Sequence, residues 1–274
     1  FCISMKSSYY KYFAALLLFG SNGIVASNIN LPSYEIVLLR LLLGSLFLIT
    51  VFTVSRQRFT FYRNKHTCLY LFISASAMGA SWMLLYEAYQ QVGISIASLA
   101  YYCGPVIVMI LSPFLFRETL TWPKIAGFLT VLAGMCLVNL QALDEGKTIW
   151  GLFCGLMSAF MYALMVTANK KAKPESGLEN SLLQLVIGSF IVVAFVSMQK
   201  NFVLSLTTID WIPVLLLGLL NTGIGCYLYF SSITDLPVQT VAICGYLEPL
   251  SAVVFSVLSV SYTHLRAHET RSNL

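Results

Sequence analysis

Residues 244–254 read CGYLEPLSAVV and place a carboxylate, Glu248, directly before Pro249. Almost all of their neighbours between 238 and 260 are apolar, as in a membrane-spanning helix. A carboxylate at the centre of a bilayer costs at least about 2.5–3.5 kcal/mol. A proline inside a helix also removes a backbone hydrogen bond. The Glu-Pro pair therefore has to be explained by the solvent around the segment and by what the segment faces.

The composition indicates that this solvent is a lipid bilayer. Of the 274 residues, 58% are hydrophobic and only 10% are charged, and the mean hydropathy is +0.80. A soluble domain carries about 25% charged residues. This chain lacks the polar surface that a soluble globule needs, so its net charge of +5 is not interpreted as a nucleic-acid-binding charge. We expect a bilayer-embedded protein with no nucleic-acid partner.

Long apolar runs predict an all-α polytopic membrane protein, since about 20 apolar residues in helix cross the hydrocarbon core. The fifth run is short, which local thinning of the bilayer accommodates. Three tryptophans, Trp122, Trp150 and Trp211, stand at the starts of runs, where an interfacial aromatic belt belongs. The sequence predicts nine complete spans, at 9–29, 34–54, 68–90, 95–116, 124–140, 149–169, 180–198, 211–232 and 238–260.

The distribution of lysine and arginine predicts the orientation. If the N-terminus is cytoplasmic and the spans alternate, the inner side holds eleven basic residues and the outer side only Lys147 and Lys200. Cytoplasmic loops carry an excess of basic residues. The bias therefore predicts a multi-pass protein of the inner membrane with a cytoplasmic N-terminus. The eleven inner residues are Lys6, Lys11, Arg56, Arg58, Arg63, Lys65, Arg117, Lys124, Lys170, Lys171 and Lys173.

The residues that carry most enzymatic chemistry are absent from the spans or badly spaced for it. The seven cysteines form no CxxC or Cys/His ligand spacing, and we expect them to be packing residues. The three histidines, at positions 66, 264 and 268, all lie outside the apolar runs. The sequence thus predicts no metal site, no cofactor and no enzymatic activity.

The chain contains a weak internal repeat with an offset of 144 residues. RLLLGSLFLI (40–49) aligns with QLVIGSFIVV (184–193), and Pro105 aligns with Pro249. The first span matches the sixth at an offset near 140, with Asn22 over Tyr162. A five-helix unit repeated once must enter the membrane from opposite sides, which gives two inverted halves. We predict a first repeat over 5–140 and a second over 141–260.

The end of the second repeat differs from that of the first. After Pro105 the chain continues through a fifth helix, whereas after Pro249 the apolar run stops at Val260. Residues 261–274, SYTHLRAHETRSNL, are polar and show no helical apolar periodicity. We predict that this tail is non-native and that the tenth helix of the repeat is missing. The alternative is a genuine but divergent terminus.

Several segments together resemble the EamA-type branch of the drug/metabolite transporter superfamily. They include LLFGSNGIVAS in the first span, LRLLLGSLFL in the second and GYLEPLSAVVFSVL in the ninth. YYCGPVIVMILSPFLFRETLTWPKIAGFLTVLAGMCLV covers the fourth and fifth. The resemblance implies ten helices in two inverted five-helix repeats. It also implies export or exchange of small metabolites, amino acids or drugs across a bacterial inner membrane. Glu118 occupies the acidic position that ends the fourth helix, but its counterpart after the ninth is absent.

Two prolines predict interrupted helices on either side of the interface between the halves. Pro249 cannot donate to the Gly245 carbonyl, and Pro105 cannot donate to that of Tyr101. The resulting bends are candidate hinges at Pro105, Gly245 and Pro249. Glu248, about ten residues into its span, is expected near the bilayer midplane facing a cavity or a partner. A purely structural hydrogen bond to a neighbouring helix is the alternative for this carboxylate.

Other polar and aromatic residues inside the spans are candidates for a substrate pocket, because buried hydroxyls seek partners. Arg40 and Glu87 are expected either to pair with each other or to extend outward to the interface; for Arg40 a structural charge pair competes with a substrate clamp, while Glu87 is assigned to the cavity. A pocket of this composition suits amphipathic or zwitterionic molecules, and its aromatic walls can hold a cation. Besides Glu248, the candidates are Asn22, Trp82, Tyr86, Glu87, Tyr101, Tyr102, Tyr162, Asn221, Tyr227 and Tyr246.

These features predict a secondary transporter that works by alternating access, one half rocking against the other. The expected partners are a small-molecule substrate and the lipid bilayer, with protons as a candidate coupling ion. The alternatives are an uncoupled facilitator and a protein that handles lipid or another ligand without coupled transport. The sequence leaves the substrate, the direction and the oligomeric state open.

Overall fold

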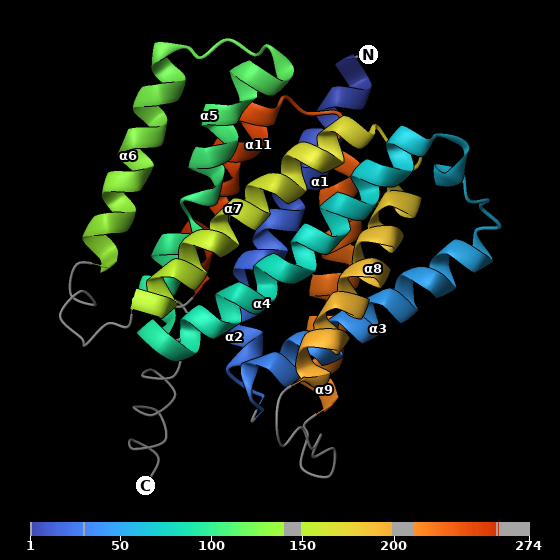
Figure 1. Cartoon of the computed structure of the whole chain (residues 1–274), viewed down its shortest axis with the longest axis horizontal. Coiled ribbons are helices and arrows are strands. Elements are labelled where there is room, and N and C mark those ends of the chain that lie inside the picture. The colour runs from blue at the N-terminus through green and yellow to red at the C-terminus, as the bar shows by residue number, and fades with distance from the viewer. Residues whose placement is uncertain (1, 30, 140–148, 199–210, 256, 258–274) are drawn as a thin grey trace, which may run out of the picture.

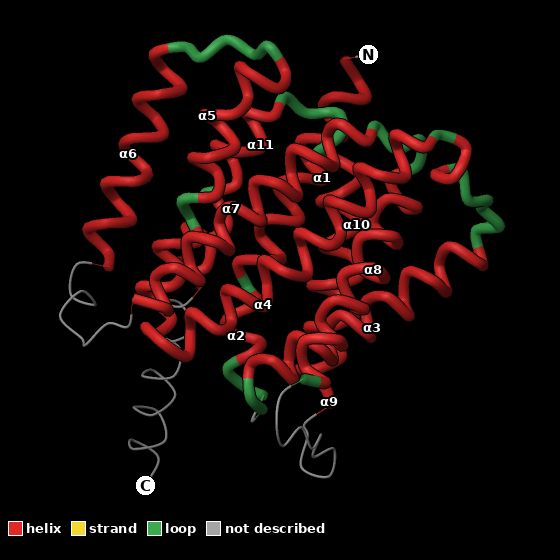
Figure 2. The backbone as a smooth tube through the Cα atoms, viewed as in Figure 1, coloured by secondary structure: helices red, strands yellow, loops and turns green. Residues whose placement is uncertain are grey.

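A computed structural model of the chain describes residues 2–29, 31–139, 149–198, 211–255 and 257. All regular elements in these ranges are helices, and none of the described residues forms a strand (Figures 1 and 2). The all-helical prediction is therefore confirmed. The predicted tail, 261–274, lies outside the described residues.

The first half of the chain runs through six α-helices and one short 3-10 helix. Their bounds are α1 (Cys2–Gly20), α2 (Asn22–Ala26), α3 (Ser33–Val54), η1 (Phe61–Arg63), α4 (Lys65–Tyr101), α5 (Gly104–Phe116) and α6 (Trp122–Asn139).

The second half contains a segment with widened, π-helical turns in the middle of one span. Its elements are α7 (Ile149–Ala172), α8 (Gly177–Ser197), α9 (Trp211–Leu215), the π-helical η4 (Leu216–Ile224), α10 (Gly225–Ser232) and α11 (Val238–Gly245). After a turn at Tyr246 the last helix resumes over residues 247–255.

Seven helical segments of the described chain are long and apolar enough to cross a membrane. They correspond to the second, third, fourth, sixth, seventh, eighth and ninth predicted spans. The first predicted span falls on α1 with α2, and the fifth on α6, which stands at the edge of the bundle in Figure 1. The segments that meet the criterion are Tyr34–Val54, Lys65–Gly93, Ile96–Phe116, Ile149–Ala172, Gly177–Ser197, Trp211–Ser232 and Val238–Phe255.

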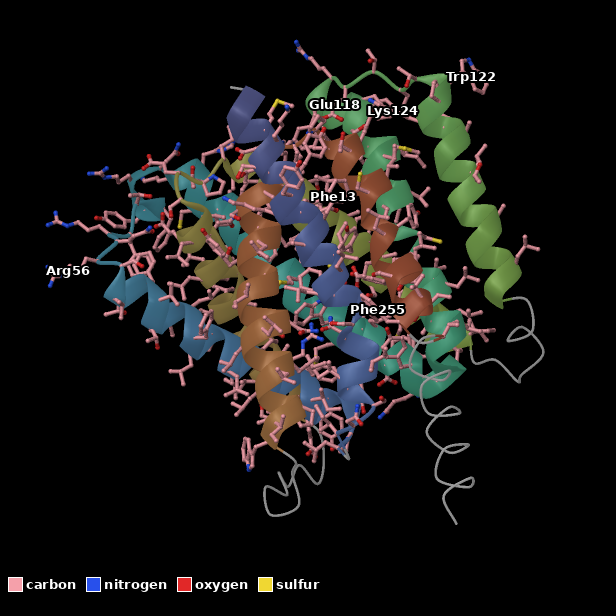
Figure 3. All side chains as sticks on the ribbon, turned by 180° about the vertical axis from the view of Figure 1, so that it is seen from behind. Phe13, Arg56, Glu118, Trp122, Lys124 and Phe255 are labelled. Carbon is pink, nitrogen blue, oxygen red and sulfur yellow. The ribbon has the colours of Figure 1, made fainter. Side chains whose placement is uncertain are left out.

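The outside of the bundle is apolar, as expected for a surface in contact with lipid rather than water. Leu46 on α3, Phe114 on α5 and Phe190 on α8 are each more than half exposed. Trp122, at the start of α6, projects from one end of the bundle (Figure 3) and is 82% exposed. The buried core, by contrast, contains many small and polar side chains between the helices.

Gly93 divides the long helix α4 into two spans. Its φ of 77° and ψ of 164° are not helical, and a positive φ is a conformation that glycine adopts without a Cβ clash. The helical segment that corresponds to the third predicted span therefore ends at Gly93, and the segment that corresponds to the fourth begins at Ile96, still within α4.

Close helix contacts recur in pairs related by the 144-residue offset. A Cβ on Gly79 of α4 would lie 2.9 Å from the Gly188 carbonyl oxygen of α8. A Cβ on Gly44 of α3 would lie 3.3 Å from the Gly223 nitrogen of η4. Adding 144 to Gly79 gives Gly223, and adding 144 to Gly44 gives Gly188. The two contacts are thus exchanged by the repeat, as a pseudo-two-fold axis requires.

The same axis relates the packing of whole helices. Helix α4 packs on α8 as α3 packs on η4, and α4 packs on α7 as α1 packs on α10. Helices α3 and α8, which are equivalent to one another, are in direct contact. Their equivalent hydroxyls, Ser45 Oγ and Ser189 Oγ, lie 3.0 Å apart and share a hydrogen bond. These reciprocal contacts fit two inverted halves; the boundary at residue 140 stays a prediction.

Candidate functional site

A charged and aromatic cluster lies inside the bundle, where the two halves meet. The guanidinium carbon of Arg40, on α3, lies 4.3 Å from the ring centroid of Trp82, on α4. This is within the range of a cation–π interaction. The Arg40 Nε is buried and has no hydrogen-bond partner. A buried donor of this kind is costly to leave unpaired, so it is suited to receive an acceptor from a ligand.

Glu248 approaches this cluster from the last helix, two residues after the turn at Tyr246. Its carboxylate is close enough to Arg40 for their charges to interact, and also to the hydroxyls of Tyr101 and Tyr162. No direct ion pair joins Glu248 to Arg40 among the described residues. The two opposite charges therefore lie near each other in the interior of the bundle without a direct ion pair.

Tyrosines form the wall of the cluster. The rings of Tyr101 and Tyr162 meet edge to face with centroids 5.6 Å apart. The Tyr162 hydroxyl lies 3.4 Å from that of Tyr229, whose ring contacts Tyr12 at 5.6 Å. Tyr12 donates to the Val241 carbonyl at 2.7 Å. This chain of rings connects α1, α7 and α10 with the two interrupted helices.

Both proline-containing spans are interrupted at equivalent places. Helix α4 ends at Tyr101 and α5 begins at Gly104, directly before Pro105. Helix α11 ends at Gly245 and the chain turns at Tyr246, three residues before Pro249. The two turns touch, because the Tyr246 hydroxyl donates to the Tyr102 carbonyl at 2.9 Å. Tyr102 and Tyr246 are separated by 144 residues; that these turns act as hinges stays a prediction.

Asn22 and Asn221 meet at a break in the first span. The chain leaves helix at Ser21, between α1 and α2. Asn221, on η4, is buried, and its Nδ2 donates at 2.9 Å to the Leu18 carbonyl, to Ser21 Oγ and to Asn22 Oδ1. The side chain therefore ties both sides of the break to the eighth span. Its hydrogen bonds are a sufficient structural reason for a polar residue at this place.

Three predicted site residues lie away from the Arg40–Glu248 cluster. Tyr86 packs edge to face on Tyr34 at 5.4 Å and accepts a hydrogen bond from Gln90. Glu87 accepts from Gln91 on its own helix at 3.1 Å; an ion pair with Arg40 is not formed among the described residues.

Tyr227, the third, lines a separate groove between α3, α8 and η4–α10. The structure thus brings together Arg40, Trp82, Tyr101, Tyr102, Tyr162, Tyr246 and Glu248, and leaves Tyr86, Glu87 and Tyr227 at the margins or elsewhere.

Sequence reasoning missed Tyr89, which lies close enough to both Arg40 and Glu248 to interact with their charges. It also missed two tyrosines of the wall, Tyr12 and Tyr229. Both are at least 95% buried. Tyr12 lies near the start of the first apolar run, where an aromatic residue is expected to be interfacial. Tyr229 lies in a run of similar aromatic residues, YLYF (227–230), in which only Tyr227 was singled out. The buried face of that helix was not evident from the pattern.

A second group of polar contacts closes the end of the bundle that carries the basic loops. Glu179, at the start of α8, is 1% exposed. It accepts hydrogen bonds from the Thr60 nitrogen at 2.6 Å, the Thr60 hydroxyl at 2.6 Å and the Phe61 nitrogen at 3.0 Å. The carboxylate thereby fastens the connection between α3 and α4 to the second half.

Glu118 does the same for the start of α11. Its two carboxylate oxygens accept from the Val238 nitrogen at 2.7 Å and the Gln239 nitrogen at 3.0 Å. A carboxylate at a helix N-terminus is stabilised by the unpaired N–H groups there. Glu118 and Lys124, which donates to Gln239 Oε1, lie together at this end of the bundle in Figure 3.

Lys170 completes the closure from α7. Its Nζ donates to the carbonyls of Ile233 at 3.3 Å and Thr234 at 2.6 Å, and also to that of Leu236. The connection from α10 to α11 is therefore held from two sides. These three charged residues, Glu118, Lys170 and Glu179, are called the basic-end clamps below.

Comparisons with known proteins identify a transporter family. A family profile described as the EamA-like transporter family matches residues 7–140 and 149–263. The chain is 26% identical over 259 residues to "Uncharacterized transporter YxxF" of Bacillus subtilis (strain 168), covering 92% of this chain and 81% of that protein. It is equally identical over 259 residues to "Uncharacterized transporter YetK" of the same organism, covering 91% and 78%.

A solved structure titled "Crystal structure of protein" has the same fold. The TM-score is 0.76 at 18% identity, covering 93% of this chain and 89% of that one. At this identity the likeness concerns the helical architecture alone.

Proposed function

Because the chain belongs to the EamA-like transporter family, and is thus a multi-pass membrane protein of a transporter family, we propose that it is a secondary transporter. It exports or exchanges a small metabolite, such as an amino acid or another amphipathic compound, across the bacterial inner membrane. Its N-terminus is cytoplasmic, and the two inverted halves alternate between states open to either side.

The proposal rests on one observation above all. Arg40 and Glu248 come from different halves and lie near each other among buried tyrosines without forming a direct ion pair. A buried, unneutralised charge is expensive in a membrane protein unless it meets a ligand or a cavity. Glu248 also stands two residues after the interruption at Tyr246, where backbone groups become available to a substrate.

The chemistry of the cluster favours a substrate with both polar and apolar parts. The unpaired Arg40 Nε suits an anionic or strongly accepting group. Glu248 and the faces of the tyrosine rings suit a cationic group. The aromatic wall supplies apolar area for the remainder. Zwitterionic or amphipathic molecules satisfy all three.

The basic-end clamps are the contacts that open and close during transport. Glu118, Lys170 and Glu179 hold the inter-helix connections at one end of the bundle closed. Opening the site to that side requires their hydrogen bonds to break. Substrate release at the basic end therefore competes with a defined set of contacts.

A thermal-shift screen followed by transport tests this function. Purified protein is screened against amino acids, amines and nucleobases, and compounds that raise the Tm are tested for uptake in proteoliposomes. Arg40→Gln and Glu248→Gln should each remove the thermal shift. Glu175→Gln, in the exposed connection before α8, should keep it. A compound that raises the Tm of the wild type and of all three variants equally would show that its binding site includes neither Arg40 nor Glu248.

A pH gradient across the same proteoliposomes separates coupled from uncoupled transport. If Glu248 carries the coupling proton, wild-type uptake depends on the gradient and Glu248→Gln uptake does not. Transport by Glu248→Gln that retains wild-type gradient dependence would exclude Glu248 as the coupling group. Wild-type transport that ignores the gradient would favour the uncoupled facilitator.

A further inference from the structure

The lining of one groove of the molecule includes neither Arg40 nor Glu248. The groove has a volume of about 410 Å³ and lies between α3, α8 and η4–α10. Its walls are mainly apolar, and its lining residues on α3 fall at helical spacing along one face. The lining consists of Phe47, Leu48, Val51, Ser55, Gln57, Leu178, Ile224 and Tyr227.

The groove runs from the interior of the bilayer to the basic end of the bundle. Phe47, on α3, and Ser55, the residue that follows the end of α3, are eight residues apart, which corresponds to about 12 Å along a helix. The hydrocarbon core is about 30 Å thick, so this length is close to that of one leaflet. The apolar end is formed by Phe47 and Ile224, and the polar end by Ser55 and Gln57.

Positive charge is concentrated at the polar end. Arg56 and Arg58 flank Gln57 in the sequence, and both are exposed. Figure 3 shows the Arg56 side chain projecting outward from the end of α3, away from the helices. Gln57 Oε1 accepts from Ser176 Oγ at 3.0 Å, which fixes this turn against the start of α8. The polar end of the groove at Gln57 therefore lies next to two exposed arginines, neither of which is part of its lining.

We propose that this groove binds one anionic glycerophospholipid of the adjacent leaflet. An acyl chain lies along Phe47, Val51 and Ile224, and the phosphate is held by Arg56 and Arg58. Basic residues at the membrane surface attract anionic headgroups with about 1 kcal/mol each, which is about fivefold in affinity per arginine. The site is independent of the transported substrate, since its lining lies apart from Glu248.

Native mass spectrometry of the full chain in detergent tests the proposal with two probes. Dioleoyl phosphatidylglycerol and dioleoyl phosphatidylcholine carry the same acyl chains and differ in headgroup charge. The wild type should retain one phosphatidylglycerol more strongly than phosphatidylcholine. The double variant Arg56→Gln/Arg58→Gln should lose that preference by about tenfold or more. Val51→Trp, which fills the half-buried groove wall, should weaken both lipids.

A matched double variant distinguishes a built site from general surface charge. Arg63→Gln/Lys65→Gln removes the same charge from exposed positions that do not line the groove, and it should keep the preference. Equal loss in both double variants would overturn the site in favour of diffuse electrostatics. Equal binding of the two lipids by the wild type would overturn the proposal in favour of unselective binding of acyl chains. A change of oligomeric mass in Val51→Trp would overturn it in favour of a second copy of the chain in the groove. Thermal unfolding without lipid confirms that the variants are folded.

Discussion

The contact between Glu179 and the connection before α4 makes a quantitative prediction. Three donors, the Thr60 nitrogen, the Thr60 hydroxyl and the Phe61 nitrogen, converge on a carboxylate that is 1% exposed. Hydrogen bonds to charged groups contribute about 1.5–3 kcal/mol each, against about 0.5–1.5 kcal/mol for neutral ones. Glu179→Gln keeps an acceptor but loses the charge, so it should destabilise the protein by about 1–3 kcal/mol. Glu179→Ala also leaves N–H groups unpaired and should cost about 3–6 kcal/mol.

Thr60 provides the matched pair of variants for this contact. Thr60→Ser keeps a hydroxyl that can donate to Glu179, whereas Thr60→Val removes it with little change of shape. Thr60→Val should therefore cost about 1.5–3 kcal/mol and Thr60→Ser much less. Because the hydroxyl and the carboxylate contact each other directly, the two changes should not be additive. The double variant Glu179→Gln/Thr60→Val should show a coupling energy of at least about 1 kcal/mol.

The assay is thermal or denaturant unfolding of the purified protein in one detergent, followed through the whole double-mutant cycle. Limited proteolysis of the 55–64 connection gives a local readout, since loss of the clamp should speed cleavage there. Identical Tm values for Thr60→Ser and Thr60→Val would refute the reasoning. So would a Glu179→Ala protein within about 0.5 kcal/mol of wild type, the range of an uninvolved surface residue.

Three further substitutions test the packing around the interface between the halves. Asn221→Ala removes the donor that ties both sides of the break in the first span, and should lower the free energy of unfolding by about 1–3 kcal/mol in a detergent unfolding titration. Gly79→Ala places a methyl group 2.9 Å from a backbone carbonyl of α8 and should lower the free energy of unfolding by about 1–3 kcal/mol. The control Gly127→Ala, where a Cβ meets nothing within 4 Å, should not destabilise the protein. Equal effects of the two substitutions would contradict the close approach of α4 and α8. Tyr246→Phe loses a 2.9 Å hydrogen bond and should lower the Tm more than Tyr227→Phe; the reverse order would show that the contact between the two turns is dispensable.

Much of the architecture follows from the sequence because its causes are local. Hydrophobic length predicted the spans, and seven of them recur as helices able to cross a membrane. Pro105 and Pro249 lie directly after interruptions of their helices, because a proline cannot complete the preceding turn. The 144-residue offset aligns residues that are in contact in the structure, such as Ser45 and Ser189.

The rest depends on long-range partners that no local pattern contains. Ser176 and Glu179 have the spacing of a capping box, which suggests a role within α8. In the structure the Glu179 carboxylate instead binds residues 60 and 61, more than a hundred positions away. The π-helical turns of η4, which carry Asn221 to the break in the first span, contain no proline themselves, although Pro213 stands three residues before them.

The placement of the tyrosines failed for a related reason. A period of 3.6 residues tells which side chains share a helix face, but not whether that face meets lipid or another helix. Tyr227 and Tyr229 are two residues apart, and only Tyr229 reaches the Glu248 side of the bundle, against Tyr12 and Tyr162. Tyr227 faces the groove beside α3 instead.

The hydrogen bond between Ser45 and Ser189 has a consequence for any attempt to follow the cycle. Ser45 and Ser189 are equivalent positions of the two halves, so the hydrogen bond between them lies on the pseudo-two-fold axis. If the halves swap conformations, this pair keeps its partner while contacts such as those of Glu179 are exchanged for others. A cross-link engineered there should leave turnover intact, and a distance probe there should stay silent; reporters belong far from the axis, where the swap is largest.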